Sequence, residues 1–338
     1  MYFNSMKYFF ILLMISSTIF SISSFSFMNM WIGMEINLMS FIPLLISKKV
    51  NSNSENMMNY FLIQSISSAN FLFSSILILI FSKWFFQNFF YMNTLIFFIM
   101  NISLLMKMGA APFHFWFPMI MNKISWLNCL ILSTWMKIIP MIIISYCFLN
   151  FILYLSIIMS AMIGSIMGLN QTSLKLIISY SSINHIAWML ANIMFNMNIW
   201  LIYFITYTII NFILILTLNL MKINFLKQIY MKTSNNLLNY FIFLNFLNLG
   251  GLPPFLGFLP KWLTINCMIA NNMTILLMLM IFFSLVSLFF YMRITYSFLL
   301  MNFFEMKFYS HNFNKMNLLL LLNFFSLTSL MMITLINF

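Results

Sequence analysis

The chain has 338 residues, of which 64% are hydrophobic and only 5% are charged, whereas a soluble domain carries about 25% charged residues. This composition excludes a soluble globular protein, because such a protein needs a polar shell. The net charge of +12 comes from basic residues scattered between apolar runs, so it indicates membrane orientation and not binding to nucleic acid.

Apolar runs of about 20 residues cross a bilayer as helices, and the sequence predicts about eleven of them. The expected spans, in chain order, are residues 8–27, 28–46, 57–81, 93–120, 124–148, 150–169, 174–194, 198–220, 237–267, 273–299 and 317–337. We expect residues 8–27 to be a retained first span, because a convincing cleavage site is lacking. The first two spans are joined by almost no residues, which predicts a tight turn.

The lysines are distributed unevenly between the two sides of the membrane. One side collects Lys7, Lys48, Lys49, Lys123, Lys175, Lys222, Lys227, Lys232, Lys307 and Lys315. The opposite side collects only Lys83. The positive-inside rule therefore predicts an N-terminus on the cytoplasmic side, or the matrix side in a mitochondrion, and a C-terminus on the other side.

The connections between spans are short, the longest being residues 221–236 and 300–316. They leave no room for a nucleotide or redox-cofactor domain. The three cysteines, Cys129, Cys147 and Cys267, lack the spacing of metal ligands. We therefore expect no catalytic residue, no cofactor and no metal site on this chain.

Two expected spans, 93–120 and 237–267, are longer than a straight crossing needs and are interrupted by glycine and proline. The interrupting residues are Gly109, Pro112, Gly250, Gly251, Pro253 and Pro254. Proline removes a backbone donor and blocks the preceding helical turn. Backbone groups freed at membrane depth are tolerated only inside protein or beside water. The sequence therefore predicts two broken helices.

The broken helices are the fourth and ninth spans, so each is the fourth member of a five-span unit. Because five is odd, the second unit is inverted relative to the first. We expect one all-α transmembrane domain over residues 1–338, with units 1–149 and 150–299 followed by a loop and C-terminal helix in 300–338. Inverted repeats with broken helices are typical of transporters, where the breaks mark the ion path. Two unrelated proline kinks are the alternative.

Four charged residues are expected inside the bilayer. Glu35, Lys107 and Lys137 lie near the middles of their spans, and Lys261 adjoins the second break. A lysine at the centre of a membrane helix costs about 2.5–3.5 kcal/mol, so each needs a counter-ion or internal water. A buried lysine with a movable partner can switch between charge states, as a proton relay requires. Structural ion pairs are the alternative.

Two histidines are further candidates for proton transfer. His185 lies mid-span beside Ser181, Ser182 and Asn184, and His114 lies in the first break. Histidine titrates near neutral pH, although a hydrogen-bonded packing role fits His185 equally well. Gly164 and Gly168 form a small-residue pattern that favours close helix packing.

Several stretches together resemble the NADH dehydrogenase subunit 2 family, the mitochondrial antiporter-like membrane subunits of respiratory complex I. The matching stretches are residues 31–38, 107–116, 170–185 and 250–262. The last reads Gly-Gly-Leu-Pro-Pro-Phe-Leu-Gly-Phe-Leu-Pro-Lys-Trp and is highly specific. The resemblance covers the whole chain.

The resemblance implies a proton-translocating subunit of NADH:ubiquinone reductase in the mitochondrial inner membrane. It places the acid at Glu35, its partner lysine at Lys107, a central lysine at Lys137 and a far lysine at Lys261. It implies that NADH, FMN, iron–sulfur clusters and ubiquinone bind to other subunits. The implied partners are membrane-arm subunits, with subunits 4 and 4L as neighbours, accessory subunits and membrane lipids.

The expected mechanism moves a proton from Lys107 through internal water past Lys137 toward Lys261, driven by redox chemistry elsewhere. Three alternatives remain open. These are a stand-alone cation/proton antiporter, a structural bridging subunit without its own pumping, and a quinone-binding enzyme subunit.

Overall fold

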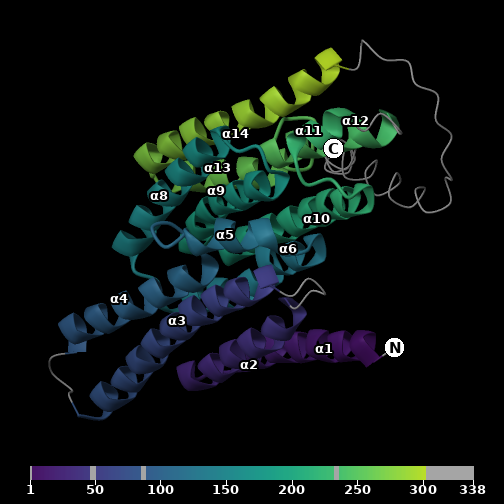
Figure 1. Cartoon of the computed structure of the whole chain (residues 1–338). Coiled ribbons are helices and arrows are strands. Elements are labelled where there is room, and N and C mark those ends of the chain that lie inside the picture. Colours follow the sequence, from purple (N-terminus) through teal and green to yellow (C-terminus); the bar gives the residue numbers. More distant parts are fainter. Residues whose placement is uncertain (1, 46–50, 85–88, 232–235, 302–338) are drawn as a thin grey trace. The chain divides into compact units, whose positions relative to one another are not determined.

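The computed structural model describes residues 2–45, 51–84, 89–231 and 236–301, which are helical almost throughout (Figure 1). The expected C-terminal span, residues 317–337, and the residues Lys48, Lys49, Lys232, Lys307 and Lys315 lie outside this part. The chain is divided into two compact units, residues 1–156 and 157–338. The expected unit boundary at residue 149 and the inverted relation of the repeats stay predictions.

The first unit is built from a series of mostly apolar helices. Its elements are α1 (Tyr2–Ser23), α2 (Phe27–Leu45), α3 (Asn51–Trp84), α4 (Phe89–Met108), α5 (Trp116–Lys123), α6 (Trp126–Ser133), the 3-10 turn η1 (Trp135–Lys137), α7 (Ile138–Cys147) and the start of α8 (Asn150–Leu169). Three residues separate α1 from α2, and these helices pack against each other. The expected tight turn between the first two spans is present.

The second unit continues from α8. Its elements are α9 (Leu174–Phe195), α10 (Met197–Met221), the short α11 (Leu226–Met231), α12 (Asn236–Gly250), α13 (Phe258–Ala270) and α14 (Thr274–Met301). Every residue of α9 from 181 to 193 is buried. α9 packs against α10, α13 and α14, so it is the core of this unit. Helix α11 lies within residues 221–236, where the sequence predicts a connection between two spans.

The described helices are apolar enough for a membrane. Six of them are long and apolar enough to span one. Large apolar side chains face outward, such as Ile275 and Phe151, which are 80% and 70% exposed. Polar residues turn inward instead, and most serines donate to the carbonyl three residues earlier, as Ser182 does to Ser179. This arrangement confirms an all-α polytopic membrane protein, whereas the helix count of about eleven stays a prediction.

Both expected breaks are present, and the structure adds a third. Span 93–120 is divided into α4 and α5, and span 237–267 into α12 and α13. The expected span over residues 124–148 is present as one apolar segment, Trp126–Cys147. It is not one regular helix, because α6 ends at Ser133 and a 3-10 turn precedes α7. The signal was Pro140, which has no N–H to offer to the carbonyl four residues earlier.

The small-residue pattern in α8 does allow close packing. A Cβ atom on Gly164 would lie 2.8 Å from the Tyr180 carbonyl oxygen, which is backbone of α9. The corresponding atom on Gly168 would meet the Phe290 ring of α14 at 3.0 Å. Gly164 therefore brings the α8 and α9 backbones together, as the sequence predicted.

Candidate functional site

The first break is a glycine-terminated helix end. Gly109 has a φ of +70°, a conformation that favours glycine. Its N–H donates to the Met106 carbonyl at 3.2 Å, and the Ala110 N–H donates to the Leu105 carbonyl at 3.1 Å. This is the Schellman pattern that closes a helix. The Trp116 indole also donates to the Met106 carbonyl, at 3.1 Å, so the exposed end of α4 is satisfied inside the protein.

Lys107 lies in the last turn of α4, just before this break, and is only 7% exposed. Its Nζ donates to the Met34 sulfur of α2 at 3.4 Å. Gln64 of α3 donates to the Lys107 carbonyl at 3.3 Å. The partial negative charge at the carboxyl end of a helix favours a cation in that turn. The break therefore supplies some of the compensation that a buried ammonium group needs.

Glu35 lies next to Met34 on α2 and is partly buried. Its charge interacts with that of Lys107, but in the part of the chain that the structure describes no salt bridge joins the two. The Glu35 Oε1 atom is buried without a hydrogen-bond partner there. Glu35 and Lys107 therefore interact through their charges without touching, and Met34 lies beside both residues.

Lys137 is the last residue of the 3-10 turn η1 and is 1% exposed. Its N–H donates to the Thr134 carbonyl at 3.2 Å. The Nζ atom lies 4.9 Å from the centre of the Phe117 ring, within the range of a cation–π interaction. Phe117 belongs to α5, so the helix that follows the first break contacts the lysine of the next span.

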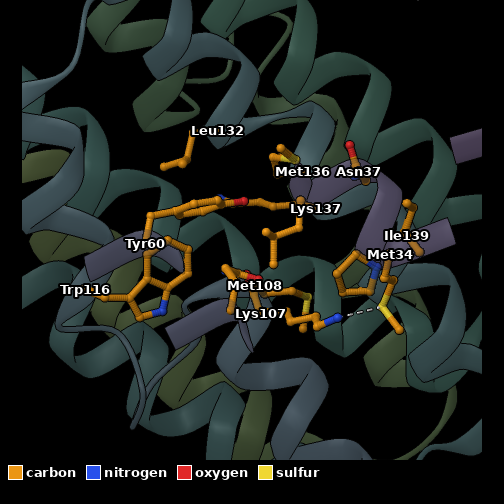
Figure 2. A pocket seen from close by; sticks show the side chains of 13 residues that line it. Met34, Asn37, Tyr60, Lys107, Met108, Trp116, Leu132, Met136, Lys137 and Ile139 are labelled. Carbon is orange, nitrogen blue, oxygen red and sulfur yellow. Dashed lines mark hydrogen bonds between the residues drawn. The ribbon is translucent and has the colours of Figure 1, made fainter. Parts of the chain in front are cut away.

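A cavity joins the two lysines. Its lining residues are Met34, Asn37, Leu38, Tyr60, Gln64, Lys107, Met108, Trp116, Leu132, Met136, Lys137, Ile139 and Pro140. Figure 2 shows Tyr60 and Trp116 on one side of it, Met34 and Asn37 on the other, and both lysines between. The cavity offers about 30 Å³ to the centres of water molecules, and one water needs about 10–15 Å³ of such space.

Polar groups of the lining are arranged to hold water. The Asn37 side chain is 5% exposed, and its Oδ1 atom is buried without a hydrogen-bond partner among the described residues. Tyr60 and Gln64 add a hydroxyl and an amide to the same lining. A buried water typically makes about three hydrogen bonds to such groups. The cavity is therefore both large enough and polar enough to hold on the order of two waters.

The second break repeats the helix ending of the first. Gly251 has a φ of +76°, and its N–H donates to the Leu247 and Asn248 carbonyls at 3.1 and 3.0 Å. Pro253 and Pro254 follow in the turn before α13. The Gly257 N–H donates to Asn248 Oδ1 at 2.8 Å, which ties the start of α13 to the end of α12.

Lys261 points back at this helix end. It is 7% exposed, and its Nζ donates to the Gly250 carbonyl at 2.7 Å. A Cβ atom on Gly251 would lie 3.1 Å from that Nζ, so glycine leaves room for the ammonium group. The carboxyl end of α12 compensates the charge, and half-helix ends of this kind bind cations in transporters.

The two histidines have different surroundings. His114 lies in the first break, 4% exposed, with Nδ1 3.3 Å from the Pro112 carbonyl oxygen. It is not among the residues that line the cavity. His185 lies on α9, 8% exposed, with Nδ1 2.8 Å from the Tyr203 hydroxyl of α10.

Comparison with known proteins places this arrangement in a family. Residues 24–287 match the model of the NADH:quinone oxidoreductase/Mrp antiporter transmembrane family. The NADH-ubiquinone oxidoreductase chain 2 of Anopheles gambiae is 42% identical over 332 residues, which cover 97% of this chain and 96% of that protein. The chain belongs to the NADH-ubiquinone oxidoreductase chain 2 family. The chain 2 protein of Mus musculus is 39% identical over 286 residues and 82% of each chain.

Solved structures share the fold of this chain 2 family member. A chain of respiratory complex I from Thermus thermophilus with bound aureothin matches with a TM-score of 0.84 and 20% identity, over 98% of this chain and 79% of that one. A chain of the Mrp complex from Dietzia matches with a TM-score of 0.71 and 14% identity, over 84% and 59%. At these identities the likeness shows the fold.

In this chain 2 family member the structure brings three of the predicted site residues together within the first unit. Lys107 and Lys137 line one cavity, with Glu35 close by, whereas Lys261 and His185 lie in the second unit. Asn37, Tyr60 and Gln64 also line the cavity, although the sequence did not predict them as site residues. Asn37 and Gln64 could have been recognised as lining residues, because each is a polar residue inside an apolar run. The sequence carries no such signal for Tyr60.

Proposed function

We propose that this chain is a proton-translocating membrane-arm subunit of NADH:ubiquinone oxidoreductase in the mitochondrial inner membrane. The observation that carries the proposal is the cavity that Lys107 and Lys137 share beside a broken helix. Family membership supports the setting, because the curated relatives carry the name of that oxidoreductase. Two lysines at membrane depth with space for water between them are suited to proton transfer.

The proposed path begins at Glu35 and Lys107. Movement of the Glu35 carboxylate changes the electrostatic stabilisation of the Lys107 ammonium. When that stabilisation falls, Lys107 releases a proton to water in the cavity, and neutral Lys137 accepts it. Lys261 is the far station, where the α12 carboxyl end stabilises the protonated form. His185 and His114 are further candidates for carrying the proton.

Energy and redox chemistry come from other subunits in this proposal. NADH, FMN, iron–sulfur clusters and ubiquinone bind there, and this chain holds none of them. Its partners are other membrane-arm subunits, with subunits 4 and 4L as neighbours, together with accessory subunits and lipids. The lysine asymmetry supports an N-terminus on the matrix side and a C-terminus on the intermembrane-space side.

Substitution of Lys137 by methionine tests the function. We expect the assembled complex with Lys137→Met to oxidise NADH while moving fewer protons per NADH, because the cavity has lost its acceptor. The measurement is the ratio of proton uptake to NADH oxidation in sealed vesicles. Lys123→Met is the matched control, because Lys123 is 45% exposed and lies 3.7 Å from Glu55 in a surface salt bridge.

The outcomes separate the proposal from its alternatives. A normal ratio for Lys137→Met in an assembled complex would support a structural bridging subunit and contradict the proposal. Cation-coupled proton transport by the purified chain alone in vesicles would support a stand-alone antiporter. A lower ratio for Lys123→Met as well would show that loss of any lysine, and not of the cavity lysine, causes the effect.

A further inference from the structure

The core of the second unit holds a buried layer of hydroxyl, amide and imidazole groups. His185 of α9 meets Tyr203 of α10, with 2.8 Å between Nδ1 and the hydroxyl oxygen. The Tyr207 ring centre lies 5.0 Å from that of His185. In the same layer Asn184 donates to Ser287 of α14 at 3.1 Å. The polar face of α9 is therefore enclosed by other helices.

The partner of His185 suits a residue that changes its charge. A carbonyl oxygen can only accept, so it would keep a proton on Nδ1 permanently. A tyrosine hydroxyl both donates and accepts. It can donate to Nδ1 of a neutral imidazole and accept from Nδ1–H of an imidazolium. Tyr203 is 1% exposed, so this hydrogen bond survives a change of protonation without help from bulk water.

We propose that Tyr203 is a positioning residue that holds His185 as the proton-carrying group of the second unit. The proposal rests on the proposed function and deepens it, because it adds a residue to the path beyond Lys137. The proton enters and leaves on the imidazole of His185. Protonated Lys137 gives the proton through internal water to the imidazole, which then gives it to neutral Lys261, so one N–H bond breaks at each donor and one forms at each acceptor. The Tyr203 hydroxyl rotates from donor to acceptor as Nδ1 gains the proton, and its own O–H bond stays intact.

The neighbouring helices supply the setting for this step. Among the described residues, the helices packed against α9 are α8, α10, α13 and α14. Their buried titratable groups are Tyr203 and Tyr207 on α10, Lys261 on α13 and Tyr291 on α14. These four groups form a mostly neutral setting with one cation. A buried imidazole can gain and lose charge there at modest cost only if its hydrogen bond is kept.

Removal of the Tyr203 hydroxyl tests the proposal in the assembled complex. Tyr203→Phe keeps the ring and removes one oxygen. We expect the rate of proton pumping to fall by roughly tenfold, which corresponds to about 1.4 kcal/mol on one step. Tyr180→Phe is the matched control, because it removes the same oxygen from a tyrosine of α9 that is only partly buried and lies outside this layer. We expect it to pump at the normal rate.

A second variant separates proton transfer from packing. His185→Gln keeps an amide that can bond to the Tyr203 hydroxyl but cannot carry the proton. We expect it to pump about as poorly as Tyr203→Phe. Normal pumping by His185→Gln, or by an assembled Tyr203→Phe complex, would overturn the inference. If the Tyr203→Phe complex does not assemble, the pumping rate of the His185→Gln complex decides whether the inference stands. A normal ratio for Lys137→Met would instead overturn the proposed function itself.

Discussion

Lys107→Met should stop proton release into the cavity while the chain still folds and assembles. Methionine has a similar length, so it fills the site of the lysine side chain without its charge. Replacing both members of a buried ion pair by apolar residues is often neutral or stabilising, whereas removing one member leaves the other charge uncompensated. Because no direct salt bridge joins Lys107 to Glu35 among the described residues, we expect the free energy of unfolding to fall by only about 1 kcal/mol. The number of protons moved per NADH oxidised, measured in sealed vesicles, should fall.

Glu35 provides the partner experiment, because its charge interacts with Lys107 without a direct salt bridge. Glu35→Gln should also lower the proton ratio. The double variant Glu35→Gln, Lys107→Met should be no worse than Lys107→Met alone, because the two groups act in one step. Additive losses would show that Glu35 acts elsewhere. An unchanged ratio for Lys107→Met would remove the first station of the path.

Gly257→Ala should destabilise the second break strongly. A Cβ atom at this position would overlap the Asn248 carbonyl oxygen, which is backbone and cannot rotate away. The substitution should also weaken the hydrogen bond from the Gly257 N–H to Asn248 Oδ1. Overpacking of this kind costs about 1–3 kcal/mol and sometimes more. We expect less assembled complex on native gels and a lower temperature of dissociation.

Gly168→Ala is the matched control for this prediction. Its Cβ atom would meet only the edge of the Phe290 ring, at 3.0 Å, and a ring can shift by a few tenths of an ångström. We expect near-normal assembly. Equal losses for the two variants would mean that any added methyl group in this unit is harmful. Normal assembly of Gly257→Ala would contradict the close contact between the ends of α12 and α13.

The helix breaks could be predicted because glycine and proline act locally. Gly109 and Gly251 need only their own backbone conformation to end a helix, and clustered prolines forbid a continuous one. The 3-10 turn that ends at Lys137 was not predicted, although Pro140 follows it in the sequence. A single proline often only bends a helix, and the turn also depends on what packs around it. The sequence therefore indicated where helices end more reliably than where one is distorted.

The charged residues could be named from the sequence, but their surroundings could not. A lysine in an apolar run must be buried, whichever residues surround it. That Lys107 contacts Met34, that Lys137 lies over Phe117 and that Lys261 bonds to the Gly250 carbonyl depends on packing between distant segments. The cavity could not be predicted from the sequence either, because its lining residues come from several helices.

The occupancy of the cavity between Lys107 and Lys137 decides whether a proton can pass between the two lysines through water. The measurement is a density map of the assembled complex at a resolution that shows ordered water. We predict water density between the two Nζ atoms, within hydrogen-bond distance of Asn37 Oδ1. A dry cavity, or one filled by a side chain in every state of the working complex, would exclude proton transfer from Lys107 to Lys137 through water.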